Sequence, residues 1–312
     1  MIRVEWNDCP RREWDRLLTG AGRSSLEQSW SYGEAVAATS CHRVDRGVLT
    51  DGAAPIALVQ VCRRTVLSAA RLNRIVRGPI WLAPDLSEAA RIEACRAIRA
   101  AFPLRRGELL FWLPELPDAP VSHRIMRATG ARRMVTGYSS AWVALGPGDA
   151  ALRAGLHGKW RNALRAAEKE ELQIKTGQGE THLAEAMAAY DRFRKHKRFI
   201  GPSGAFIRRI AEAGARTRDV LLLRAQSGGQ AVAGVVLIRH GASATYVAGW
   251  TTDEGRRRRA HNLLLWSGMQ ELRRAGTAWL DLGGVNANSA PGVARFKLGL
   301  GGEVFTLVGT YL

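Results

Sequence analysis

Near its C-terminus the chain reads Trp279-Leu-Asp-Leu-Gly-Gly-Val-Asn-Ala-Asn-Ser-Ala-Pro-Gly-Val-Ala-Arg-Phe-Lys297-Leu-Gly-Leu-Gly-Gly302. The apolar start predicts a strand over 279–282, and the paired glycines indicate turns or close backbone approaches. A polar loop and a basic segment follow, and another strand is expected over 304–308. Lys297 lies between an aromatic residue and a glycine-rich run. That setting suits either an ammonium held beside a backbone-lined site or an exposed lysine in a turn.

The composition is that of a globular chain with a large positive charge. The chain has 312 residues, 46% of them hydrophobic, and a formal net charge of +18. Residues 151–312 hold 25 basic residues against 13 acidic ones, whereas residues 1–150 hold 21 against 15. Such an excess favours a polyanionic partner, for example RNA, a nucleotide diphosphate or anionic lipid. A GC-rich genome that encodes Arg in place of Lys would produce the same excess without any function.

Several classes of protein lack their usual signals here. No run of about 18 apolar residues is present, so no stable membrane insertion is expected. The first residues do not read as a signal peptide, which predicts a cytoplasmic protein. The four cysteines are scattered singly, so we expect reduced thiols and no metal site. The motifs of P-loop ATPases, zinc hydrolases, dinucleotide enzymes and serine hydrolases are absent. The sequence does not indicate an oligomeric state.

The apolar pattern predicts two halves that each mix strands and helices. Gly146-Pro147-Gly148 is the best linker candidate, so we predict domains over 1–148 and 149–312. Hairpin signals in the middle of each half favour an α+β class with a largely antiparallel sheet, the same unit used twice. In the second half, one helix is expected over 149–171 and another over 181–198, capped by Thr181.

A basic loop precedes the helix predicted over 260–275. It reads Gly255-Arg-Arg-Arg-Arg259-Ala-His-Asn262. Cations before a helix N-terminus form an anion site because free N–H groups and the helix dipole favour phosphate; a solvated basic turn is the alternative. Tyr246 and Trp250 lie just upstream and could stack a base, although core packing is expected for at least one of them. His196 and His261 adjoin basic clusters, and packed or solvated side chains are expected for both.

Six short motifs occur in a fixed order over almost the whole chain. They are Gln28-Ser29-x-x-Tyr32-Gly33, Arg77-Gly78-Pro79, Lys159-Trp-Arg161-x-x-Leu-Arg-x-Ala-Glu-Lys169, the segment from Arg257 to Asn262-x-Leu264-x-Trp266, Asp281-x-Gly283-Gly284, and Phe296-Lys297-x-x-Leu-Gly-Gly302. In this order the chain resembles the Fem family of peptidoglycan peptidyltransferases and its FemAB-like relatives. The strand–loop–helix–strand order also looks like the core of GNAT N-acyltransferases.

The resemblance implies two tandem GNAT-like subdomains, each a mostly antiparallel mixed sheet flanked by helices. It implies transfer of an aminoacyl group from aminoacyl-tRNA, as co-substrate, to an amine of a peptide or cell-wall precursor, with no separate cofactor. Phe296 and Lys297 match family residues that contact the acceptor and the reacting carbonyl. A fixed ammonium there would stabilise the negative charge on the carbonyl oxygen. Asp281 is a candidate general base, and a buried structural aspartate is the other interpretation.

The remaining candidate residues fall into two groups along the same motifs. For substrate binding they are Trp30, Tyr32, Tyr246, Trp250, Gly283 and Gly284, and for the donor RNA or its phosphates they are Lys159, Arg161, Arg256, Arg257, Arg258, Arg259 and Asn262.

Departures from the patterns of the Fem family and of the GNAT enzymes bear on the substrates. The helix that opens with an Arg in some Fem family members reads Gly201-Pro-Ser-Gly-Ala-Phe206 here. Glu34 follows the first motif where family members often carry a basic residue that holds a diphosphate, which makes a small peptide or amino acid a plausible acceptor. The alternative function is an acyl-CoA-dependent N-acyltransferase, which would need R/Q-x-x-G-x-G/A in the basic loop. Ala260 and Asn262 stand where the two small residues belong, and their β-carbons disfavour close wrapping of a diphosphate. A non-catalytic RNA-binding module is a third possibility.

Overall fold

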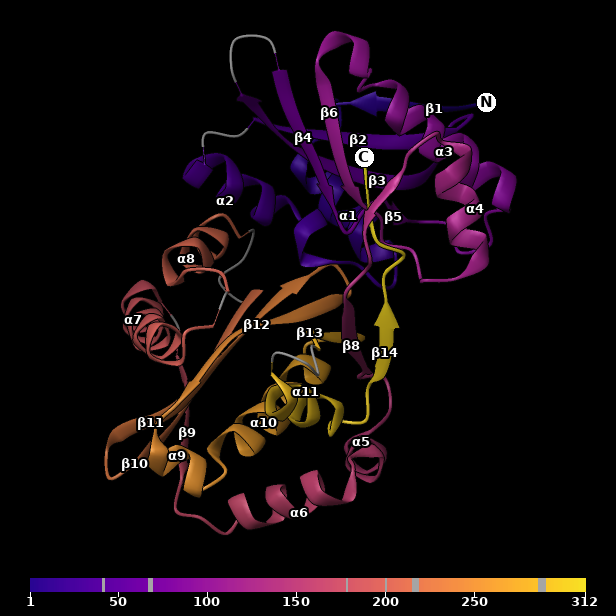
Figure 1. Ribbon diagram of the computed structural model, residues 1–312. Coiled ribbons are helices and arrows are strands. Elements are labelled where there is room, and N and C mark those ends of the chain that lie inside the picture. Colours follow the sequence, from indigo (N-terminus) through magenta and orange to yellow (C-terminus); the bar gives the residue numbers. More distant parts are fainter. Residues whose placement is uncertain (41–42, 67–69, 178, 200, 215–218, 286–289) are drawn as a thin grey trace. The chain divides into compact units, whose positions relative to one another are not determined.

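The computed structural model describes residues 1–40, 43–66, 70–177, 179–199, 201–214, 219–285 and 290–312 (Figure 1). By their contacts these residues form two compact units, Met1–Ser139 with Phe305–Leu312, and Ser140–Val304. The sequence predicts the division at the Gly-Pro-Gly run, whereas in the structure the chain leaves the first unit earlier, after Ser139. The reason is that strand β8 (Ser139–Ala144) pairs with β13 of the second sheet, and β15 (Thr310–Tyr311) returns to the first sheet.

The first unit is built on one mixed sheet of strand order β1-β2-β3-β4-β6-β15-β7, with β5 paired to β3. The pairs are antiparallel apart from β4 with β6. Alternation along β2 and β3 sends Val48 and Leu58 to the face covered by α1, and Leu49 and Val59 to the opposite hydrophobic core. The remaining elements are β1 (Ile2–Trp6), β2 (Arg43–Asp51), β3 (Ala54–Val66), β4 (Ala70–Val76), β5 (Ile80–Trp81), β6 (Glu108–Leu113), β7 (Arg133–Val135), α1 (Arg11–Gly20), η1 (Leu26–Gln28), α2 (Trp30–Ser40), α3 (Glu88–Ala100), η2 (Leu104–Arg106) and α4 (Pro120–Ala128).

The second unit repeats this plan with a sheet of order β14-β8-β13-β12-β11-β10-β9. Strands β12 and β13 pair in parallel over 243–245 and 279–281, whereas β9 to β12 form an antiparallel run. Its elements are α5 (Asp149–Gly155), α6 (Gly158–Ala167), β9 (Gln173–Gly177), α7 (Glu180–Lys197), α8 (Gly204–Glu212), β10 (Val220–Ser227), β11 (Gln230–His240), β12 (Ser243–Thr251), α9 (Asp253–Arg257), α10 (Ala260–Arg274), β13 (Trp279–Gly284), α11 (Pro291–Leu298) and β14 (Glu303–Thr306). The predicted α+β class, with two mixed sheets flanked by helices, is confirmed.

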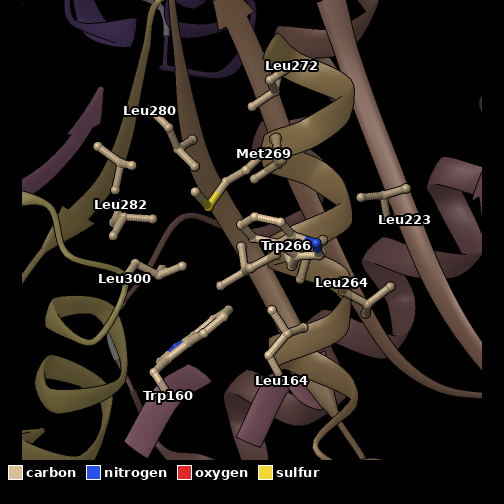
Figure 2. Close-up of a cluster of buried hydrophobic side chains, with 14 of the residues drawn as sticks. Trp160, Leu164, Leu223, Leu264, Trp266, Met269, Leu272, Leu280, Leu282 and Leu300 are labelled. Atoms are coloured by element: carbon tan, nitrogen blue, oxygen red, sulfur yellow. The ribbon is translucent and has the colours of Figure 1, made fainter. Parts of the chain in front are cut away.

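Helices cover both faces of the second sheet (Figure 1). Helix α10 lies on one face, and α7 and α8 lie on the other. Figure 2 shows the α10 side, where Leu264 and Met269 of the helix meet Leu280 and Leu282 of β13 and Trp160 of α6 in one buried cluster. Each large apolar side chain removed from water in this way stabilises the fold by roughly 1.5–3 kcal/mol.

Three predicted elements differ from the structure. The helix expected over 149–171 is two helices, because the backbone turns extended at Leu156 between α5 and α6. Helix α7 starts after Gly179, which has φ of 92°, so Thr181 lies inside the helix and does not cap it. The basic segment before Lys297 is helix α11, which Pro291 starts at its first turn. Most of the polar loop predicted before it, residues 286–289, lies outside the described residues.

Candidate active site

Lys297 lies in the last turn of α11 and donates a hydrogen bond from Nζ to the carbonyl oxygen of Gly284, at 2.9 Å. The side chain is half-buried. Burial lowers the pKa of the Lys297 ammonium, and the nearby charge of Asp281 acts in the opposite direction. An ammonium has three N–H donors, and Gly284 accepts from one. Lys297 is therefore anchored by the backbone, and its other two donors make no hydrogen bond with a described residue.

Asp281 is fully buried in β13 and shapes the turn that holds Lys297. Its Oδ1 accepts the N–H of Gly283 at 2.7 Å, and Gly283 has a φ of 71°, a conformation that glycine adopts without steric cost. A carboxylate with no exposed surface is poorly placed to take a proton from a substrate amine. The geometry therefore favours the structural interpretation of Asp281, in which it orients the Gly283-Gly284 turn.

Tyr246 and His261 form a pair beside Lys297 that the sequence did not single out as catalytic. The Tyr246 hydroxyl lies 3.4 Å from Nε2 of His261, and Nζ of Lys297 lies 6.0 Å from the centre of the Tyr246 ring. Burial raises the pKa of the Tyr246 phenol and lowers the pKa of His261 to about 4. Near neutral pH the phenol therefore keeps its proton and the imidazole is uncharged, so the phenol can donate and Nε2 can accept in the contact between them.

A β-bulge in β12 separates Tyr246 from Trp250. In the pairing with β11, Leu237 opposes Tyr246 but Val236 opposes Ala248, so Val247 is an extra residue. The extra residue reverses the alternation. Tyr246 therefore points toward His261 of α10, whereas Trp250 faces the α7 side of the sheet.

Trp250 lines a pocket of about 380 Å³ together with residues of α7 such as Phe193 and with Arg224 of β10. This pocket and the Lys297 site lie on opposite faces of the sheet. The structure thus does not bring Trp250 together with the other aromatic candidates, and core packing is its main contact: only 8% of the residue is exposed.

Gly249 makes room for the Tyr246–His261 pair. A β-carbon at position 249 would overlap the Tyr246 hydroxyl and would lie 2.8 Å from Nε2 of His261. Any larger residue would therefore displace one member of the pair. Glycine at this position is a requirement of the site that becomes visible only when the strand and the helix are placed together.

Phe296 and Trp160 form the wall next to the pair. The Phe296 ring lies 6.2 Å from the His261 ring, edge to face, and 5.9 Å from the ring of Trp160. Trp160 is buried and ties α6 to α11, since Gly299 leaves no space for a β-carbon against it. On either side of Trp160, Lys159 is exposed and Arg161 donates to the carbonyl oxygen of Ala154.

The segment predicted as a basic loop is the end of helix α9 (Asp253–Arg257) followed by Arg258 and Arg259, because Thr252 caps a short helix there. We keep the name basic loop for residues 255–259, whose arginines are divided between paired and unpaired ones. Arg256 pairs with Asp253, and Arg258 pairs with Glu254 and Glu170. Arg257 and Arg259 are exposed, and neither side chain has a hydrogen bond or ion pair with a described residue. Asn262 is buried, and its N–H donates to the carbonyl oxygen of Arg259 at 3.0 Å. Two of the predicted phosphate-binding arginines are therefore available to a ligand.

Trp30 and Tyr32 belong to the first unit, whereas the other candidate residues belong to the second. The guanidinium of Arg46 lies 3.6 Å from the centre of the Trp30 ring and also pairs with Glu34. One face of the indole is therefore covered. Burial raises the pKa of the Tyr32 phenol.

The first two motifs of the ordered set contact each other within the first unit. The Gln28 amide donates to the carbonyl oxygen of Val76 at 2.8 Å and its side chain packs on Gly78, while Ser25 donates to the carbonyl oxygen of Arg77. These contacts hold η1 against the end of β4. Both motifs thus have a structural reason to occur together.

The described residues contain no group of three or more His, Cys, Asp and Glu side chains placed to hold a metal ion. In the same part of the chain, no helix has both the length and the apolar character needed to cross a lipid bilayer.

Comparison with known proteins places the chain among acyltransferase folds. Residues 151–298 match the family described as Acetyltransferase (GNAT) domain. No curated protein matches the sequence. Among solved structures, the chain is similar to FemX, with a TM-score of 0.82 at 13% identity over 98% of this chain and 96% of FemX.

Two further structures share the whole architecture. A conserved protein of unknown function from Bacteroides thetaiotaomicron has a TM-score of 0.62 at 12% identity, over 99% of this chain and 98% of that one. A tandem GNAT protein from the clavulanic acid biosynthesis pathway has a TM-score of 0.56 at 13% identity, over 99% and 98%. These likenesses confirm the tandem GNAT-like fold, shared with FemX, that the motifs lead us to expect, and together with the GNAT match over residues 151–298 they support an acyltransferase.

Proposed function

We propose that this protein is an aminoacyl-tRNA-dependent aminoacyltransferase that forms an amide bond on an amine acceptor, such as a small peptide or a cell-wall precursor. The observation that carries the proposal is the placement of Lys297: a half-buried ammonium, anchored on Gly284 and adjacent to the Tyr246–His261 pair. Such a group suits a reaction in which negative charge develops on one oxygen and a proton must move close by.

The proposed reaction assigns a role to each of these side chains. The acceptor amine attacks the carbonyl carbon of the aminoacyl ester, and Lys297 donates a hydrogen bond to the oxygen on which negative charge develops. The new C–N bond remains when the ester C–O bond breaks. The nitrogen loses one proton and the ribose oxygen gains one, so the reaction needs no other reactant. Tyr246 supplies a proton to the leaving oxygen, and neutral His261 accepts the proton that the nitrogen loses and passes it to Tyr246, so both side chains end the reaction as they began.

The start of α10 supports an RNA-borne donor. The β-carbon of Ala260 and the side chain of Asn262 are buried there, and Gly255 is required for packing because a β-carbon would overlap the carbonyl oxygen of Val232. No glycine is thus left to let the backbone wrap a diphosphate closely. The unpaired cations Arg257 and Arg259 are instead suited to phosphates spaced along a nucleic-acid backbone.

An acyl-CoA donor is the second candidate. It is favoured by the match of residues 151–298, which include Lys297, to an acetyltransferase domain, and by the similarity to a tandem GNAT protein whose description names AcCoA. Thioester and oxygen ester would place the carbonyl oxygen against the same Lys297 ammonium. The two donors differ in what lies beyond the leaving atom, which is the part that the basic loop would contact.

The test supplies both donors at once. The protein is incubated with a mixture of aminoacylated tRNAs, acyl-CoAs and candidate amines, and the products are identified by mass. We expect an aminoacyl amide that disappears when the tRNA is deacylated beforehand. An acyl amide that forms only when CoA thioesters are present would establish the second candidate. Formation of neither product would leave the proposed activity without support.

A further inference from the structure

The C-terminal end of α7 carries a group of cations that the candidate active site does not include. Arg192, Lys195, Lys197 and Arg198 are all exposed, and no side chain among them has a hydrogen bond or ion pair with a described residue. We name these four residues the α7 basic surface. Its density of uncompensated charge creates a positive field that favours an anionic partner.

Neighbouring arginines behave differently, which makes the α7 basic surface distinct. Arg194 pairs with Asp191 and donates to the carbonyl oxygen of Gly201, so it fixes the loop after the helix. Arg208 and Arg209 in α8 pair with Glu212. Ion pairs therefore neutralise the arginines that hold elements together, whereas the α7 basic surface has no acidic partner among the residues that the structure describes.

Arg198 occupies a backbone conformation in which glycine would be favoured. It ends α7 with φ of 52° and ψ of 35°, in the left-handed region, and its N–H closes the helix on the carbonyl oxygen of Lys195. A residue with a β-carbon in this conformation is less stable than glycine by roughly 1 kcal/mol. The helix dipole favours cations in the last turn of α7, which explains Lys195 and Lys197. Its effect falls off beyond that turn, so it does not explain an arginine in place of glycine at position 198. An exposed arginine kept there indicates a role for its charge.

An exposed aromatic residue follows the cations. Phe199 is 39% exposed and contacts the rings of Phe193 and Tyr190 edge to face, at 6.2 and 6.1 Å. A single aromatic face beside several cations suits a nucleic acid, whose phosphates meet the cations and whose bases stack on the ring. A membrane surface would require a broader apolar face, and the apolar residues of α7, such as Leu183 and Met187, are buried within the unit.

We propose that the α7 basic surface binds the phosphate backbone of RNA, as a contact separate from the basic loop at the start of α10. This proposal rests on the proposed function, because the RNA in question is the one that carries the aminoacyl group. Each cation that contacts a phosphate adds about 0.7–0.9 to the slope of log affinity against log salt concentration. The four residues together would therefore account for a slope of roughly three.

Binding of mixed aminoacylated tRNA is measured by fluorescence anisotropy between about 50 and 200 mM salt. The test variants are Lys195→Gln/Lys197→Gln and Arg198→Gly, and the matched control is Arg105→Gln/Arg106→Gln, which removes two exposed arginines from η2. We expect the lysine pair to reduce the slope by between one and two, and Arg198→Gly to reduce it by about one, relative to the control. Because glycine relieves the backbone, Arg198→Gly should lose RNA affinity while its Tm stays level or rises. Slopes equal to that of the control would overturn the proposal.

Two further measurements separate this proposal from its alternatives. Vesicles containing anionic lipid are tested with the same variants, and loss of vesicle binding with unchanged tRNA binding would assign the surface to membranes and overturn the proposal. Transfer from a short aminoacyl ester, which lacks the tRNA body, should be unchanged in Arg198→Gly. If wild-type protein binds tRNA with the expected slope but transfers nothing from it, the proposed function fails while the RNA-binding surface stands.

Discussion

The neutral state of His261 has a consequence that can be measured without knowing the substrate. Burial lowers the pKa of His261 to about 4 in the folded protein, whereas the ordinary value is 6.5. Between these two pH values the unfolded chain binds a proton at this residue and the folded chain does not. Since stability follows the difference in bound protons, the free energy of unfolding falls as the pH is lowered through this window.

The size of the loss follows from the shift. Each pH unit inside the window changes the free energy of unfolding by about 1.4 kcal/mol per proton. At pH 5 the contribution is therefore about 2 kcal/mol, and near pH 4 it reaches about 3 kcal/mol. These are large fractions of the roughly 5–15 kcal/mol by which folded proteins are stable. At pH values more than about one unit above 6.5 the imidazole is neutral in both states and contributes no slope.

The contribution of His261 is isolated by comparing urea unfolding of the wild-type protein with that of His261→Gln, at half-unit steps from pH 7 to pH 4.5. The other histidines and the carboxylates titrate in both proteins, so they cancel in the difference. His196→Gln, which removes an exposed histidine of α7, is the matched control. As the pH is lowered from 7 to 5, we expect the free energy of unfolding of His261→Gln to rise by about 2 kcal/mol relative to that of the wild type. A difference that stays constant with pH would show that His261 is not held neutral and would refute its role beside Tyr246.

Three other predictions concern the same unit. Lys297→Met should lower the rate of single-turnover transfer by about 10²-fold or more without lowering Tm, and a loss under threefold would remove Lys297 from the mechanism. Because burial lowers the pKa of Lys297, the activity of the wild-type protein should decline with rising pH before the pH reaches the ordinary lysine value of 10.5. Gly249→Ala should reduce transfer strongly through displacement of Tyr246, with an unchanged far-UV spectrum, and full activity would contradict the steric argument. Gly301→Ala should lower the calorimetric Tm, because Gly301 has φ of 77° and a β-carbon there would overlap the carbonyl oxygen of Gly155; an unchanged Tm would mean that the backbone yields without cost.

Local patterns in the sequence were sufficient to predict much of the fold. The apolar run over 279–282 identified the strand β13. Local chemistry is also visible where Ser87 and Ser203 accept backbone N–H groups at the starts of α3 and α8, as serine does at helix starts. The ordered motifs identified the FemX-like architecture although FemX is only 13% identical. These features depend on neighbouring residues or on short motifs, so the sequence contains them directly.

The predicted donor loop and the Lys297 motif both lie in one unit, and the structure places Gly283, Gly284 and Phe296 beside Lys297. The boundaries were less accessible, since no local signal shows that residues after 304 rejoin the first sheet. The structure places Tyr246 and Trp250 on opposite faces of the sheet for a related reason, and Trp250 is the one that packs in the core. A strand is read with a strict period of two, and one extra residue at Val247 reverses the faces beyond it.

What the sequence determined by itself is therefore the class of fold, the order of its elements and the lysine most worth testing. Only the tertiary structure decided which residues lie next to this lysine. They are His261 from a helix, Tyr246 from a bulged strand, and Gly249, which leaves room for both. The physical reason is that a pKa and a steric fit depend on distances between atoms of different elements. Those distances are set by packing, which brings residues together irrespective of their spacing along the chain.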